Sequence, residues 1–206
     1  MSEKYKYDNI IISGIPASGK SLLVRGLLER LVGWEFHSIG DLVKAQHRKV
    51  YSEVKTEIPL SIWWSGLSEE EQIKFNEDLF EKMERGKIIA DTRYATICKD
   101  GNILYRKTGK EKYRDVRLNS LLVFVEAPLN IRAERVLSRP DYLGKSLDSV
   151  KEELERREEK EHKIGLEIFG VDYKNKKDYD IVINSFSMTP EEEISSVMDM
   201  MKVRNY

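Results

Sequence analysis

Short runs of apolar residues alternate along the chain with segments in which apolar residues recur at helical spacing. The first run, residues 9–13, is almost continuously apolar and rich in β-branched residues, which is typical of a strand buried on both faces of a parallel sheet. From Lys20 onward, leucines at helical spacing predict a helix that stops near Gly33. The beginning of the chain therefore predicts a strand, a glycine-containing loop and a helix.

The same alternation continues to the end of the sequence. Further strands are expected at residues 35–38, 87–91, 121–126 and 180–184. Helices are expected at residues 41–51, from Ser68 to about Arg85, from Pro128 onward, over residues 147–169, and after Thr189. Residues 52–66 give no clear pattern. Five strands alternating with helices predict an α/β fold in which a parallel sheet is covered by helices on both faces.

Composition limits the class of protein. With 206 residues, 40% hydrophobic and 34% charged, the chain is expected to form a single soluble domain. A net charge of -1 argues against a general nucleic-acid or membrane binder. Cys98 is the only cysteine, which suits a reducing compartment, and no apolar stretch approaches the ~20 residues of a membrane span. We expect a cytoplasmic protein.

The loop after the first strand carries the strongest chemical signal. Its residues match the pattern G-x-x-x-x-G-K-[ST] in full, between a predicted strand and a predicted helix: Gly14, Ile15, Pro16, Ala17, Ser18, Gly19, Lys20 and Ser21. Such a loop turns its amide groups toward phosphate oxygens at a helix N-terminus. We expect it to bind ATP, with Lys20 on the β and γ phosphates and Ser21 on Mg²⁺. Asp91, at the end of a predicted strand, is a second candidate for the magnesium shell.

The order of several motifs resembles that of nucleoside monophosphate kinases, most closely the short archaeal-type cytidylate kinases. The likeness covers nearly the whole chain and rests on the following segments: residues 14–21, 38–44, 88–93, 127–135, 157–159, 169–172 and 179–184. The first motif is common to many nucleotide-binding proteins, whereas the ordered set is far more specific.

The resemblance implies a single kinase domain of the P-loop NTPase fold, with a core at residues 7–51 and 86–206. Three further parts accompany the core: an acceptor-binding arm at about 38–85, an insertion at about 98–118 and a helical lid at about 136–162. It implies that Asp41, Lys44 and Arg93 bind the acceptor, with Arg93 on its phosphate. It also implies catalytic roles for Lys20, Arg93, Arg135, Arg139 and Arg157. Positive charge on a closing lid is what phosphoryl transfer between two polyanions requires.

The lid arginines also have a structural interpretation, because a basic helix stripe with i, i+4 ion pairs has the same composition. The sequence departs from the family pattern at Lys44, where an arginine is usual, and at Thr92, where a small residue is usual. Trp63 and Trp64 lie in a stretch with no match, and they are compatible with stacking on a base or with packing. Residues 98–118 look like a basic β-hairpin.

Three alternatives to a nucleoside monophosphate kinase remain at this point. The first is a P-loop kinase with another acceptor, either a small molecule or a nucleic-acid end. The second is a GTP-binding switch protein, since residues 141–144 and 175–178 match the D-x-x-G and N-K-x-D patterns, although neither follows a predicted strand. The third is a P-loop module without turnover, against which intact Lys20, Ser21 and Asp91 argue.

Overall fold

The computed structural model describes residues 5–54, 63–64, 66–92 and 118–202. Its centre is a five-stranded sheet in the order β2-β3-β1-β4-β5, and every neighbouring pair is parallel. The strands are β1 (Asn9–Gly14), β2 (Glu35–Ser38), β3 (Ile88–Asp91), β4 (Ser120–Glu126) and β5 (Ile181–Asn184). The predicted α/β fold with five parallel strands is therefore confirmed.

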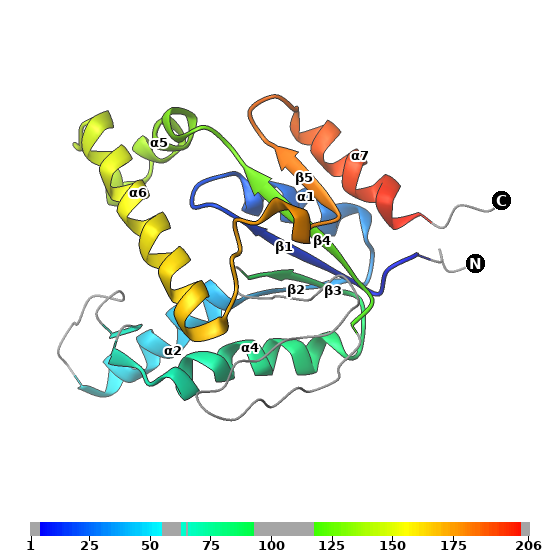
Figure 1. Cartoon of the computed structure of the whole chain (residues 1–206), viewed down its shortest axis with the longest axis horizontal. Helices are drawn as coiled ribbons and strands as arrows, with labels where there is room; N and C mark the ends of the chain where they lie inside the picture. Colours follow the sequence, from blue (N-terminus) through cyan, green and yellow to red (C-terminus); the bar gives the residue numbers. More distant parts are fainter. Residues whose placement is uncertain (1–4, 55–62, 65, 93–117, 203–206) are drawn as a thin grey trace.

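Helices cover both faces of this sheet (Figure 1). They are α1 (Lys20–Arg30), α2 (Ile39–Val54), α4 (Glu69–Met83), α5 (Leu129–Leu137), α6 (Leu147–Ile164) and α7 (Pro190–Met201). Two short 3-10 helices, η1 (Pro140–Tyr142) and η3 (Lys176–Asp178), and a π-helical turn, η2 (Gly165–Phe169), complete the described elements. None of the helices in the described part of the chain is long and apolar enough to span a membrane.

The alternation of side chains along β1 divides the core into two layers. Ile10 and Ile12 pack with Leu27 of α1 and Val197 of α7 on one face of the sheet. Ile11 packs on the other face with residues of α2 and α4. Successive side chains of a strand point to opposite faces, and a strand buried on both must be apolar throughout. This explains the unbroken apolar run in β1.

Several element boundaries follow from local chemistry. The predicted capping box at Ser68 is present: the Ser68 hydroxyl accepts from the Glu71 amide, and the Glu71 carboxylate accepts from the Ser68 amide at 2.8 Å. Thr189 and Glu192 form the same arrangement at the start of α7. Each capping box satisfies amide groups that a helix N-terminus leaves without partners.

Several predicted boundaries were wrong by one to a few residues. Helix α2 begins at Ile39, two residues earlier than expected, and thus includes Gly40, which disfavours helix. Strand β3 begins at Ile88 because Lys87 has a left-handed φ of 61°. The long charged helix ends as an α-helix at Ile164 and continues as a π turn to Phe169. The expected hairpin in the insertion and Arg93 lie outside the described residues.

Candidate active site

The loop between β1 and α1 lies at the carboxyl edge of the sheet, next to the ends of β3 and β4. Its backbone uses left-handed φ values at Gly14 (144°), Ala17 (62°) and Gly19 (106°). A Cβ atom at Gly14 would collide with the carbonyl oxygen of Val125 on β4, so glycine is required there. The two glycines that the sequence motif specifies thus allow a turn tight enough to end β1 and begin α1.

Helix α1 begins at this loop without a neutralising group. Gly19 is its N-cap, no side chain caps it, and its first turn holds no acidic residue. The amide dipoles of the first turn therefore favour an anion at this end of the helix. Ser21 is exposed in the same turn, with its hydroxyl available to a ligand from solvent.

Lys20 is a charged residue of this turn and is buried, with an exposed fraction of 7%. Its ammonium group donates to the carbonyl oxygens of Gly14 at 3.0 Å and Ile15 at 3.1 Å. These bonds hold the ammonium group against the loop itself. A phosphate bound in the loop would lie next to this ammonium group, which fits the role that the sequence predicts for Lys20.

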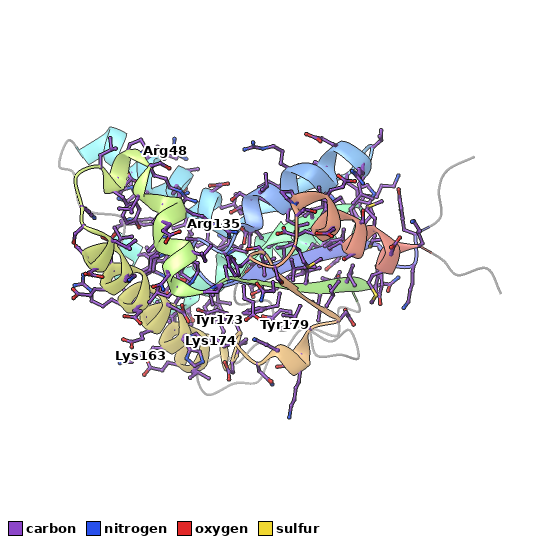
Figure 2. The ribbon with its side chains drawn as sticks, turned by 90° about the horizontal axis from the view of Figure 1, so that it is seen from above. Arg48, Arg135, Lys163, Tyr173, Lys174 and Tyr179 are labelled. Carbon is purple, nitrogen blue, oxygen red and sulfur yellow. The ribbon has the colours of Figure 1, made fainter. Side chains whose placement is uncertain are left out.

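The outer side of the loop is held by α5 and by the turn after β5. Arg132 donates to the Pro16 carbonyl at 3.2 Å, and Arg135 donates to the Ser18 carbonyl at 3.3 Å. The Ser185 hydroxyl donates to the same Ser18 oxygen at 2.6 Å. Figure 2 shows Arg135 in the space between α5 and α1.

Asp91 ends β3, where it pairs in register with Ile12 of β1 and Ser38 of β2. It is half-buried, and it lies at the same edge of the sheet as the loop. The next residue, Thr92, is buried and donates its hydroxyl to Oδ1 of Asn76 on α4 at 3.2 Å. This bond joins the end of β3 to α4, so the residue that departs from the family pattern has a structural contact.

The other predicted acceptor residues lie on α2. Asp41 and Lys44 form an exposed ion pair at 3.3 Å, one helical turn apart. Trp63 and Trp64 are half-buried and pack against the core formed by α2, α4 and β3. Trp64 lies 5.6 Å from the ring of Phe75, measured between centroids. Both tryptophans thus take part in packing, and their stacking on a base stays a prediction.

The remaining predicted arginines flank the segment between α5 and α6. Arg139 follows α5 and is exposed, and no side-chain partner for it occurs among the described residues. Arg157 on α6 is half-exposed and donates to Glu161 at 2.8 Å, the i, i+4 ion pair that was the structural alternative for this residue. In Figure 1, α5 and α6 stand beyond the carboxyl ends of the strands.

The segment from η1 to α6 has its own polar cluster. The Lys145 ammonium contacts the Glu153 carboxylate at 2.6 Å and lies 4.8 Å from the centre of the Tyr142 ring. The bond from Lys145 lowers the pKa of Glu153, and burial, followed by the charge of Glu153, raises the pKa of Tyr142. These contacts give the proposed lid segment internal order.

Sequence reasoning missed three contributors to the site. Ser185 carried no motif, whereas Arg132 and Glu158 were included only as members of the segments that carry the resemblance, residues 127–135 and 157–159. Arg132 is buried and pairs with Glu158 of α6 at 3.0 Å, while Glu158 also contacts Lys174 at 2.6 Å. Because these residues act on backbone carbonyls or on one another across the fold, no local pattern marks them.

A glycine loop between a central strand and a helix, with a lysine buried against the loop, defines a P-loop nucleotide-binding fold. Solved structures agree with this fold at low sequence identity. A shikimate kinase from Bacteroides thetaiotaomicron matches with a TM-score of 0.53 and 14% identity, covering 93% of this chain and 97% of that one. A gluconokinase from Sinorhizobium meliloti matches with a TM-score of 0.52 and 15% identity, covering 95% and 92%.

The model of the cytidylate kinase-like family matches residues 25–187, and the chain belongs to this family. A cytidylate kinase from Methanopyrus kandleri is 25% identical over 190 residues, 90% of this chain and 89% of the relative. One from Ignicoccus hospitalis is 26% identical over 193 residues, covering 93% and 98%. The protein is thus a nucleotide kinase of the nucleoside monophosphate kinase class.

The two GTPase-like tetrapeptides have other places in this fold. Residues 141–144 begin at the second residue of η1. Residues 175–178 comprise the N-cap and the three residues of η3, which precedes β5 and does not follow a strand. Asn175 donates to the carboxylate of Asp178 at 2.9 Å, so these two side chains bond each other. Neither segment has the strand context that a guanine-binding switch protein requires.

Proposed function

We propose that this protein transfers the γ-phosphoryl group of ATP to CMP or dCMP, giving the corresponding diphosphate and ADP. The observation that carries the proposal is the P-loop with its buried Lys20 ammonium, in a chain of the cytidylate kinase-like family. The acceptor preference is supported by the cytidylate kinases to which most of the chain is similar.

In this proposal the donor phosphates lie in the loop from Gly14 to Ser21, with the Lys20 ammonium between the β and γ groups. Arg93 orients the acceptor phosphate, with Asp41 and Lys44 on the acceptor side. Arg139 and Arg157 approach from the lid segment and offset the negative charge that develops during transfer. Little covalent work is left to the protein, so positioning and charge account for most of the rate.

The residues at the loop fit a magnesium ion that binds together with ATP. Ser21 offers an exposed hydroxyl at the start of α1, and Asp91 offers a carboxylate at the neighbouring strand end. No cluster of three or more metal-binding side chains occurs among the described residues. Mg²⁺ keeps several waters and is commonly held by one or two protein oxygens plus substrate phosphates, so this sparse donor set suits it. When bound, the ion would neutralise charge on the transferred phosphoryl group.

The acceptor is tested by coupled ADP release with ATP and Mg²⁺ against CMP, dCMP, UMP, AMP and GMP, with a control lacking acceptor. We expect strong stimulation by CMP or dCMP. Stimulation by UMP alone would move the assignment to another pyrimidine nucleotide. Absence of stimulation by all five would refute nucleoside monophosphate transfer.

A second candidate is transfer to a different acceptor, a small molecule or a nucleic-acid end. The observation that favours it is Lys44, which offers a single point charge where the family pattern has a bidentate arginine, and which already pairs with Asp41. A panel of nucleosides, small alcohols and 5′-hydroxyl oligonucleotides distinguishes it, because an Arg93-dependent kinase requires a monophosphate on its acceptor.

A further inference from the structure

Two carbonyl groups of the P-loop accept hydrogen bonds from donors outside the loop. The Pro16 oxygen accepts from the Arg132 guanidinium at 3.2 Å. The Ser18 oxygen accepts from the Ser185 hydroxyl at 2.6 Å and from Arg135 at 3.3 Å. The contacts come from α5 and from the turn after β5, which are far from the loop in sequence.

These bonds determine which way the loop amides face. A peptide unit is planar and trans, so its N–H points opposite to its C=O. Holding the Ser18 carbonyl outward turns the Gly19 amide toward the inside of the loop, and holding the Pro16 carbonyl outward does the same for Ala17. Ala17 adopts a left-handed φ of 62°, a conformation that persists in a residue with a side chain only when its surroundings enforce it.

The donors are themselves fixed in place. The Arg132 guanidinium uses all three of its nitrogens: toward the Ala127 carbonyl at 3.1 Å, the Pro16 carbonyl at 3.2 Å and the Glu158 carboxylate at 3.0 Å. Its exposed fraction is 5%, which leaves no face for a substrate.

Ser185 is fixed in a similar way from the opposite side. Its hydroxyl accepts from Arg135 at 2.8 Å, and its carbonyl accepts from the same guanidinium at 2.7 Å. A serine hydroxyl has one proton, and the bond from Arg135 leaves that proton for the Ser18 oxygen. Arg135 therefore orients the Ser185 hydroxyl and supports the same carbonyl directly.

We propose that Ser185, Arg132 and Arg135 are positioning residues that hold the P-loop amides in their phosphate-binding orientation from outside the loop. The inference rests on the proposed binding of ATP by this loop. In this proposal Arg135 acts on the ATP side of the site, where it maintains the conformation of the loop before the reaction begins. The proposal also makes α6 part of the support, because the Glu158 carboxylate pairs with Arg132.

The test compares Ser185→Ala with Ser187→Ala by calorimetric titration of ATP. Ser187 lies in the same turn, and its hydroxyl donates only to the Asn184 carbonyl at 3.3 Å, so Ser187→Ala is a matched control. We expect about fivefold weaker ATP binding in Ser185→Ala, corresponding to about 1 kcal/mol for one hydrogen bond. Binding in Ser187→Ala is expected to equal that of the wild type.

Inorganic tripolyphosphate separates positioning of the loop from contact with the base. If Ser185 acts through the loop, Ser185→Ala weakens ATP and tripolyphosphate by the same factor. A loss confined to ATP would instead indicate a contact with the nucleoside and overturn the proposal, as would unchanged binding of both ligands.

Arg132 provides an independent test. Arg132→Met removes the bond to Pro16, and we expect more than tenfold weaker ATP binding. Arg132→Lys should not restore it, because one ammonium cannot span three acceptors in the geometry of a guanidinium. Full rescue by lysine would contradict the proposal. If Arg132→Met fails to fold, Ser185→Ala decides alone. These titrations are carried out without an acceptor. Their results therefore test the support of the P-loop independently of whether CMP or dCMP is the acceptor.

Discussion

Replacing Gly14 by alanine tests the geometry on which the whole phosphate site depends. A Cβ atom at this position would lie 2.9 Å from both the nitrogen and the carbonyl carbon of Val125, and its oxygen is nearer still. Val125 belongs to β4, which pairs with β1 in register along six residues. The two central strands would have to separate, or the loop would have to leave its position.

Two contributions to the free energy of unfolding add at this position. A left-handed φ costs a residue with a side chain about 1–2 kcal/mol, and overpacking in a rigid region costs about 1–3 kcal/mol. Gly33 supplies the control, because its φ of 82° is also left-handed while nothing lies within 4 Å of its Cβ position. We therefore expect Gly14→Ala to lose about 1–3 kcal/mol more than Gly33→Ala.

Urea denaturation of both variants, followed by circular dichroism, measures this difference from the transition midpoints at constant slope. ATP titration of the same samples shows whether the loop moves, and we expect weak ATP binding only in Gly14→Ala. Equal losses of stability in the two variants, or normal ATP binding in Gly14→Ala, would refute the steric argument.

Three further predictions concern single side chains. Lys20→Ala is expected to abolish turnover with little change in the melting temperature, and near-normal rates would remove Lys20 from the reaction. Arg93→Ala is expected to raise the acceptor KM and lower kcat, whereas a change in ATP affinity alone would contradict its role. Burial raises the pKa of the Glu193 carboxyl against the opposing charge of Arg135. Because the pKa of this carboxyl is raised in the folded protein, ionisation of Glu193 lowers the stability of the fold as the pH rises through that pKa. Glu193→Gln should therefore raise the melting temperature at pH 7 but not at pH 4. Equal gains at both pH values would show that ionisation of Glu193 does not affect stability.

The sheet and the P-loop were predictable because their signals are local. Residues 9–13 needed no tertiary information to indicate a buried strand, and the loop motif required only a strand before it and a helix after it. The first two residues of α2 were missed because Gly40 disfavours helix, yet the chain enters the helix directly from β2.

The support behind the loop was not predictable in the same way. Ser185 and Ser18 are separated by 167 positions, and the bond between them joins a side chain to a backbone carbonyl. Every residue type has a backbone carbonyl, so the bond requires no particular residue at position 18. The sequence therefore contains no pair of residue types that would reveal this contact. For Arg132, the sequence shows only that the side chain is positively charged. Its three acceptors come from separate segments and lie around it only in the folded chain.

The sheet order places β1 between two groups of strands that are also separate along the chain. The strands that follow it up to β3 lie on one side of β1, and the strands from β4 onward lie on the other. Along the chain, the proposed acceptor residues Asp41, Lys44 and Arg93 all precede β4, whereas α5 and the turn after β5 support the nucleotide loop. The proposed acceptor residues thus occupy one continuous stretch of sequence, which shares only Asp91 with the proposed site for ATP and its magnesium ion.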